Sequence, residues 1–214
     1  MISEERKELN RQRIIDVSTE LFVRQGIAMT TLAQIARESN VVCRTVSNIF
    51  GSKGNLVLED LRSILQKMMN RLYRVVATPE YGTLTGLEQI LCILRTRGAL
   101  LMTRPAILLL LNEIKVWAAR SYHDGQVVKV YTDNLKSLYR MLGDALDKGH
   151  SDGSINPVIE KKQALSILGP AFRAVIQQLA LAKINPEFSR VLDVEEELEI
   201  QLSMVRDGLR NHNR

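Results

Sequence analysis

The segment that most constrains this chain runs from Thr30 to Lys53 and reads TTLAQIARESNVVCRTVSNIFGSK. Thr31 can cap a first short helix, and Gln34 lies three residues later, at the spacing of a capping box. Asn40 marks the end of that helix, because asparagine often takes the left-handed conformation found there. A second short helix follows, and Ser52 can cap a third. The pattern predicts two short helices joined by a tight turn.

The second short helix has two different faces. Val46, Ile49 and Phe50 can enter a core. The outward residues are Cys43, Arg44, Ser47 and Asn48. Arginine, serine and asparagine side chains hydrogen-bond base edges and phosphates. The segment therefore predicts a DNA-binding helix-turn-helix, with an ordinary helical hairpin as the alternative.

A longer pattern extends without a gap from residue 13 to residue 56. Its members are Arg13, Ile14, Ile15, Asp16, Leu21, Phe22, Gly26, Thr30, Thr31, Ile35, Ala36, Val41, Thr45, Phe50, Lys53 and Leu56. This pattern resembles the DNA-binding region of the TetR family of bacterial repressors. The resemblance implies an N-terminal DNA-binding domain followed by a helical domain that binds an effector and forms a dimer.

Four positions depart from the pattern of that family. Asn40 replaces the usual glycine, and Val42 replaces a serine or threonine, so the second helix forgoes a cap worth about 1 kcal/mol. Ser47 replaces a tyrosine and has a shorter reach. Ile49 replaces a histidine or tyrosine and cannot donate a hydrogen bond. Because the replaced side chains often contact phosphates in the family, we expect an unusual operator.

Six residues are candidates for DNA contact. Arg44 and Asn48 are the best readers of base edges, through guanine and adenine respectively. The full set is Thr31, Arg44, Thr45, Ser47, Asn48 and Lys53. Arg11 or Arg13 can add a phosphate contact, although interleaved glutamates make a solvated surface an equal alternative.

Charge and composition agree with this prediction. Residues 1–78 hold 12 Lys+Arg and 8 Asp+Glu, giving +4, while residues 79–214 hold 17 and 16, giving +1. The charged N-terminus does not resemble a signal peptide, and the apolar run 106–111 is too short to span a bilayer. Two cysteines without a spacing pattern suggest neither a disulfide framework nor a metal site. We expect a cytoplasmic protein without a cofactor.

Helical periodicity continues along the rest of the chain, and no strand pattern interrupts it. We predict an all-α fold of about nine helices. The DNA-binding domain should cover residues 1–53 and a helical effector-binding and dimerisation domain residues 54–214, with a connecting helix over 53–76. Motifs of nucleophilic, nucleotide-dependent or metal-dependent enzymes do not occur, so we do not expect an enzyme.

The middle helices, residues 83–148, should enclose an apolar cavity for a small effector. Candidate ligand contacts are Arg95, Met102, Glu113, Trp117, Asn134, Leu138 and Phe172. Glu113 would favour a cationic or hydrogen-bonding ligand, whereas Met102 and Trp117 would favour an apolar or aromatic one. The alternative for Glu113 is a bond to Lys115 or Arg120, or exposure to solvent.

The last two helices, residues 158–183 and 188–210, should form the surface of a homodimer. Candidate interface residues are Leu168, Val175, Leu179, Leu198, Leu202 and Val205. Such a dimer can place two recognition helices one DNA turn apart on a palindrome. An effector would then release the DNA by shifting the dimer to another form. The alternative function is a dimeric helical sensor or adaptor that has lost specific DNA binding.

Overall fold

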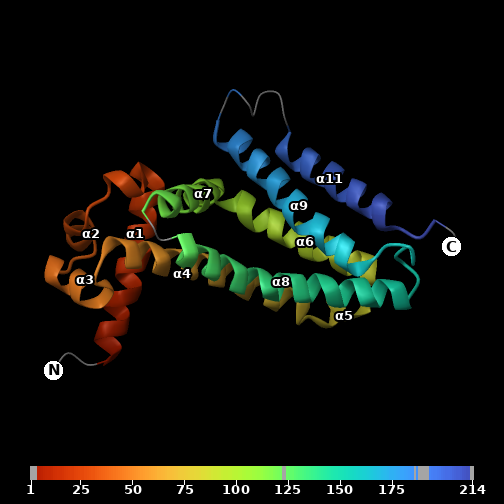
Figure 1. The fold of residues 1–214 in the computed structure, drawn as a ribbon, viewed down its shortest axis with the longest axis horizontal. Helices are drawn as coiled ribbons and strands as arrows, with labels where there is room; N and C mark the ends of the chain where they lie inside the picture. The colour runs from red at the N-terminus through yellow and green to blue at the C-terminus, as the bar shows by residue number, and fades with distance from the viewer. Residues whose placement is uncertain (1–3, 122–123, 186, 188–192, 213–214) are drawn as a thin grey trace. The chain divides into compact units, whose positions relative to one another are not determined.

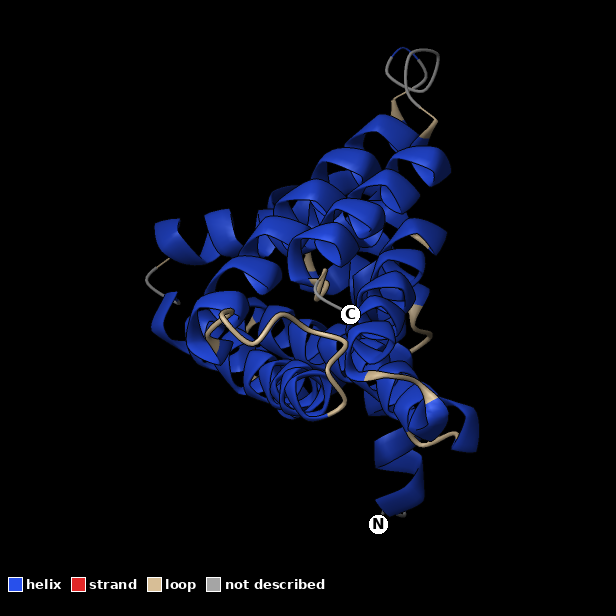
Figure 2. Ribbon diagram, turned by 90° about the vertical axis from the view of Figure 1, so that its right-hand side faces the viewer, coloured by secondary structure: helices blue, strands red, loops and turns tan. Residues whose placement is uncertain are grey.

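The structure, a computed structural model, describes residues 4–121, 124–185, 187 and 193–212. Within these ranges every regular element is a helix (Figure 2). The helices are α1 (Glu4–Met29), α2 (Leu32–Glu38), α3 (Cys43–Phe50), α4 (Lys53–Val76), α5 (Pro79–Thr83), α6 (Gly86–Thr103), α7 (Pro105–Arg120), α8 (Asp124–Ser151), α9 (Lys161–Ile184) and α11 (Val194–Leu209). The all-α prediction is confirmed. The short α5 lies where the sequence indicated only a break.

The chain forms two compact units. The first consists of Met1–Gln66 and Leu109–Thr132, and the second of Lys67–Leu108 and Asp133–Arg214. Helices α4, α7 and α8 therefore each contribute to both units. The first unit contains the helix-turn-helix together with a segment from the middle of the chain. A domain boundary at residue 53 stays a prediction.

The core of the first unit comes from the apolar faces of its helices. Leu21 and Phe22 of α1 are buried, and so are Ile35 of α2 and Val46 of α3. Helix α4 adds Leu56, which is also fully buried. This core fixes α2 and α3 against α1 and α4, so the orientation of the helix-turn-helix is set by packing rather than by its turn alone.

The second unit contains α6, α9 and α11, which lie side by side (Figure 1). Thr85 and Glu88 form a complete capping box at the start of α6. Gly98 allows close approach in the middle of the same helix, because a Cβ there would lie 3.1 Å from Leu198 and 3.2 Å from Ile176. Each of the three helices contacts the other two, so together they form a three-helix bundle.

The predicted dimer interface stays a prediction, but burial within the protomer divides its six residues. Helices α9 and α11 bury Leu168, Leu179, Leu198 and Leu202 inside the protomer, while Val175 and Val205 are half-buried. The sequence prediction took the most regular apolar stripe of each helix for the interface, but that stripe packs on the protomer's own core. The large apolar side chains that these helices expose are Ile167, Leu181, Ile184, Ile200 and Met204.

One helix in the described part of the chain, α9, is long and apolar enough to cross a membrane by length and composition. A third of its most apolar window, 33%, is buried. Core helices of soluble proteins meet the same criteria, and α9 packs against α6 and α11. Its apolar character is therefore accounted for in part by helix packing.

Candidate nucleic-acid interface

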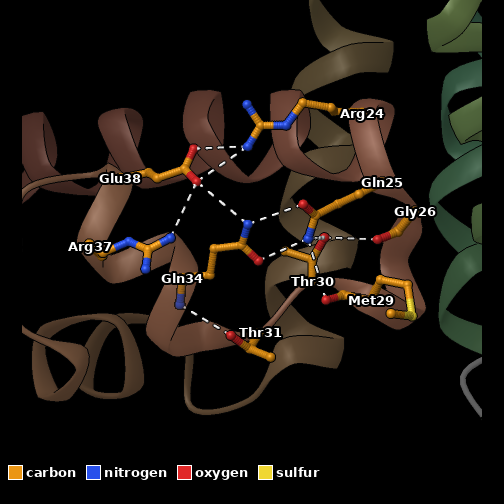
Figure 3. A network of polar contacts seen from close by, with 9 residues as sticks. All are labelled: Arg24, Gln25, Gly26, Met29, Thr30, Thr31, Gln34, Arg37 and Glu38. Carbon is orange, nitrogen blue, oxygen red and sulfur yellow. Dashed lines mark hydrogen bonds and ion pairs between the residues drawn. The ribbon is translucent and has the colours of Figure 1, made fainter.

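Helix α2 is fixed to the end of α1 by a polar network (Figure 3). The Thr31 hydroxyl caps α2 by accepting from the Gln34 N–H at 3.1 Å, as the sequence predicts. The Gln34 side chain does not complete a capping box, because it exchanges hydrogen bonds with Gln25 at 2.8 and 3.1 Å. The Thr30 hydroxyl donates to the Gly26 carbonyl at 2.8 Å. These bonds hold α2 in position independently of the turn that follows.

The turn between α2 and α3 has the geometry predicted from Asn40. Asn40 has φ 54°, the left-handed conformation that ends a helix. The Val41 N–H then donates to the Ala36 carbonyl at 3.0 Å. Asparagine thus adopts, at the position where the family has glycine, a left-handed conformation that glycine also favours.

Helix α3 presents the two faces that the sequence predicts. Val46 and Phe50 are buried. The exposed residues are Cys43, Arg44, Ser47 and Asn48, while Thr45 is half-buried. At the start of the helix Val42 provides no side-chain cap, as expected, and it is 69% exposed. The outer face of α3 is therefore polar and accessible, and its first N–H groups lack a side-chain acceptor.

A groove of about 520 Å³ lies between the first turns of α1 and the start of α3. Its lining residues are Arg6, Leu9, Asn10, Arg13, Asn40, Val41, Val42 and Thr45. Arg13 is exposed there, whereas Arg11 pairs with Glu59 and stands over the Phe50 ring at 5.8 Å. Of the two arginines considered from the sequence, Arg13 is thus the one that lines the groove. A groove with a cation and uncapped N–H groups suits a phosphate.

Lys53, a predicted phosphate contact, has a protein partner. Its ammonium group donates to the Ala28 carbonyl at 3.3 Å. Partial burial lowers the pKa of Lys53, and the carboxylate of Glu113 acts in the opposite direction. Contact between Lys53 and DNA stays a prediction.

Glu113 lies in the first unit rather than among the predicted ligand contacts of the second. Its Oε1 accepts a hydrogen bond from the Ile27 N–H at 2.6 Å. This contact follows the bend at Gly26, where φ is 83°. The partner is neither Lys115 nor Arg120, the two residues that the sequence suggested. A role as ligand anchor stays a prediction, but the carboxylate already has a structural partner.

Asp60 is a buried acid that the sequence analysis did not single out. It lies on α4 with no exposed area and accepts from the Ser18 hydroxyl at 2.9 Å. Its Oδ2 has no hydrogen-bond partner among the residues that the structure describes. Burial raises the pKa of Asp60 well above its usual value, and hydrogen bonds from Ser18 and Thr19 only partly oppose this effect. The sequence feature that could have indicated this buried acid is its position within the apolar stripe of α4, between Leu58 and Leu61.

The seven predicted ligand contacts divide between the units. Glu113 and Trp117 belong to the first unit, and the other five belong to the second. Met102, Leu138 and Phe172 are buried, and Asn134 is half-buried. Arg95 is exposed and forms two hydrogen bonds with Glu199, at 2.9 and 2.6 Å. Among the described residues no group of three metal-ligating side chains occurs, and both cysteines are free thiols.

Comparison with protein families decides the assignment. The model of the bacterial regulatory proteins of the tetR family matches residues 14–59. This range includes α2, α3 and the four groove residues Asn40, Val41, Val42 and Thr45, while the groove residues on the first turns of α1 precede it. The chain belongs to the TetR family. This is a family of DNA-binding transcriptional regulators and not of enzymes, which is the class that the sequence predicts.

Similarity in sequence to other TetR-family proteins is strongest near the N-terminus. The chain is 33% identical to the regulator HbdR of Aromatoleum sp. (strain CIB) over 69 residues. These aligned residues make up 32% of this chain and 30% of HbdR. The chain is 24% identical to the repressor KstR2 of Rhodococcus jostii (strain RHA1) over 159 residues, and this aligned segment makes up 74% of each chain. The chain thus spans less than a third of HbdR but most of KstR2.

Solved structures extend the similarity in fold to nearly the whole TetR-family chain. FadR from Bacillus subtilis, in complex with stearoyl-CoA, has a TM-score of 0.72 at 14% identity and covers 93% of this chain and 99% of its own. A protein from Saccharomonospora viridis, in complex with choline, has a TM-score of 0.73 at 18% identity, with 94% and 98% covered. At these identities the matches establish the fold alone.

Proposed function

We propose that this TetR-family chain is a cytoplasmic, homodimeric repressor that binds a palindromic operator and leaves it when a small apolar or aromatic effector binds. The observation that carries DNA binding is the outer face of α3. Arg44, Ser47 and Asn48 are exposed there, while Val46 and Phe50 anchor the helix in the core. An anchored helix with a polar outer face is the form in which a recognition helix enters the major groove.

The six predicted DNA contacts have separate roles in this proposal. Arg44 and Asn48 read bases, since both are exposed on α3. Thr31, Thr45 and Ser47 bond to phosphates, and Arg13 binds one in the groove beside α3. Lys53 contributes its charge near the start of α4, because its hydrogen bond to Ala28 leaves two further donors on the ammonium group.

Dimerisation is supported by the exposed apolar side chains of α9 and α11. Ile167 and Met204 are each 63% exposed, and Ile200 is 44% exposed. A second copy of the chain can cover these side chains by an isologous contact of α9 and α11. Two-fold symmetry in the protein then matches two-fold symmetry in the operator.

Binding of an effector is supported by the second unit and by the structural relatives. FadR from Bacillus subtilis was solved with stearoyl-CoA, and the protein from Saccharomonospora viridis with choline. The buried side chains of Met102, Leu138 and Phe172 give the second unit of this chain an apolar interior. An effector that binds one dimer form more tightly than the other shifts the population away from the DNA-binding form.

Fluorescence anisotropy with DNA fragments that flank the protein's own gene tests the proposal, in a salt series from about 50 to about 300 mM. We expect one fragment to bind tightly and to resist competition by random DNA. Replacing Arg44 with alanine should cost about 1–3 kcal/mol and relax base preference. Arg140→Ala, which removes an exposed arginine of α8, is the matched control.

A sensor or adaptor without specific DNA binding is the alternative. The absence of a side-chain cap at Val42 and the short side chain of Ser47 favour it. Sequence-blind binding with a steep salt dependence, equal for wild type and Arg44→Ala, would support this alternative over a repressor.

A further inference from the structure

Two arginines project from neighbouring helices of the second unit. Arg97 belongs to α6 and Arg173 to α9, and these helices pack side by side (Figure 1). A Cβ at Gly98, the residue after Arg97, would lie 3.2 Å from Cδ1 of Ile176. Ile176 is one helical turn beyond Arg173. The two arginines therefore lie at the same level of the helix pair.

Tyr139 of α8 approaches this level from a third helix. A Cβ at Gly169 of α9 would lie only 2.7 Å from the Tyr139 hydroxyl oxygen. Gly169 is one helical turn before Arg173, so the phenol contacts the same face of α9. Arg173 and Tyr139 both lie close enough to Arg97 to affect its ionisation. Three polar side chains from three helices thus form one cluster.

The described part of the chain supplies no acid that pairs with an arginine of this cluster. Among the residues that the structure describes, neither Arg97 nor Arg173 forms an ion pair or a hydrogen bond. Desolvation and, secondarily, the charge of Arg173 lower the pKa of Arg97 to about 10. Arg95, two residues earlier on the same helix, is different, since Glu199 binds it through two hydrogen bonds. Arg95 is therefore exposed and paired, whereas Arg97 is half-buried and has no partner among the described residues.

A half-buried charge without a partner is less well hydrated than an exposed one, and a second charge of the same sign adds to the cost. At neutral pH Arg97 keeps its charge, because a pKa of about 10 is still well above 7. A bound anion can therefore neutralise the charge of this cluster, which no described acid neutralises. Guanidinium groups bind carboxylates and phosphates through paired hydrogen bonds, and a phenol can donate one more.

We propose that Arg97, Arg173 and Tyr139 bind the anionic group, a carboxylate or a phosphate, of the effector. This inference rests on the proposed function only in taking the ligand to be the effector. Phe172, next to Arg173, is buried, and so is Leu138, next to Tyr139. An apolar body beside an anionic head group is the ligand chemistry that these residues suit. The effector is then an amphipathic anion rather than a cation held by Glu113.

Isothermal titration calorimetry on the full-length protein tests the site with four probes of equal chain length. They are decanoate, decyl phosphate, 1-decanol and decyltrimethylammonium. We expect the two anions to bind more tightly than the neutral and cationic probes, and their ranking distinguishes a carboxylate site from a phosphate site. Arg97→Met should weaken anion binding at least about tenfold and leave 1-decanol binding nearly unchanged. Arg140→Met, at an exposed position of α8, should change neither.

Thermal unfolding of the ligand-free protein gives a readout that needs no ligand. Arg97→Met keeps an apolar stem but removes the uncompensated charge, so its melting temperature should rise above that of wild type. A lower melting temperature would mean that Arg97 is satisfied within the folded protein and would overturn the proposal, whether or not a decyl probe binds. Equal binding of decanoate and 1-decanol, or unchanged anion binding in Arg97→Met, would also overturn it.

DNA anisotropy without ligand separates this inference from the proposed function. If Arg97-dependent anion binding is found but no fragment binds specifically, the repressor assignment fails and the anion site stands. If a fragment binds specifically and the anions do not discriminate against 1-decanol, the repressor assignment stands and the anion site fails.

Discussion

The carboxylate of Glu113 on α7 accepts a 2.6 Å hydrogen bond from the backbone N–H of Ile27 on α1, 86 residues away in sequence. Gly26, with φ 83° and ψ 160°, interrupts α1 directly before this N–H, so the usual helical acceptor is lost. Glu113 replaces that acceptor. The bond connects α7 to the end of α1, from which α2 and the recognition helix continue.

Replacing Glu113 with alanine leaves the Ile27 N–H without its acceptor. A donor that loses its partner in a partly buried position costs about 1–3 kcal/mol. We expect urea unfolding of Glu113→Ala to show a loss of that size and operator affinity to fall with it. Glu113→Gln keeps an acceptor oxygen and is the matched control. Equal losses in both variants would show that the charge, rather than the hydrogen bond, matters.

Val42→Ser should strengthen the start of α3. Val42 has φ −77° and ψ 148°, the extended conformation of an N-cap residue, but makes no side-chain cap. A serine hydroxyl can accept from an N–H of the first turn and add about 1 kcal/mol of stability. Chemical denaturation measures this gain, with Val42→Ala as the control that removes the valine without adding a cap. A serine variant no more stable than the alanine variant would contradict the prediction.

Asp60 should make stability depend on pH. Its pKa is raised in the folded protein, so the folded state holds the proton more tightly than the unfolded chain. This contribution is fully present below the ordinary pKa of aspartate and is lost as the pH rises through the folded pKa. Asp60→Asn cannot titrate. We expect the difference in unfolding free energy between Asp60→Asn and wild type to grow in favour of the variant from about pH 4 upward, whereas a difference independent of pH would argue against a protonated Asp60.

A charge placed on the exposed face of α11 should disrupt the proposed dimer. Met204 is 63% exposed, and burying a glutamate there without a partner is strongly unfavourable. Sedimentation of Met204→Glu should shift from dimer to monomer at micromolar concentration. Val158→Glu adds the same charge at an 83% exposed site outside α9 and α11 and should remain dimeric. A dimeric Met204→Glu would place the interface elsewhere.

The parts of the fold that local sequence determines were predicted well. The cap at Thr31, the left-handed Asn40 and the exposed face of α3 depend on residues close together in the chain. Such features follow from backbone preferences and periodicity, which a sequence displays directly. The missing cap at Val42 was predicted for the same reason.

Contacts between distant residues were not predicted. Nothing near Glu113 indicates that its acceptor oxygen meets Ile27, and the sequence suggested Lys115 or Arg120 instead. Periodicity identified the apolar stripes of α9 and α11 but could not say whether Leu168 and Leu202 face the protomer core or a partner. Arg95 and Arg97 are both arginines of the same predicted helix, and the sequence does not show which of them has an acidic partner. Only the packed structure shows that Glu199 pairs with Arg95. Burial and pairing depend on tertiary structure.

The unit that carries the helix-turn-helix is discontinuous in sequence, because it combines Met1–Gln66 with Leu109–Thr132. A chimaera of two regulators can be made by joining the N-terminal helices of one chain to the remaining helices of another at a single point. In this protein such a junction at residue 53 would supply a foreign α7, and with it a foreign residue opposite Ile27. The two units of this chain therefore cannot be exchanged as two continuous blocks of sequence.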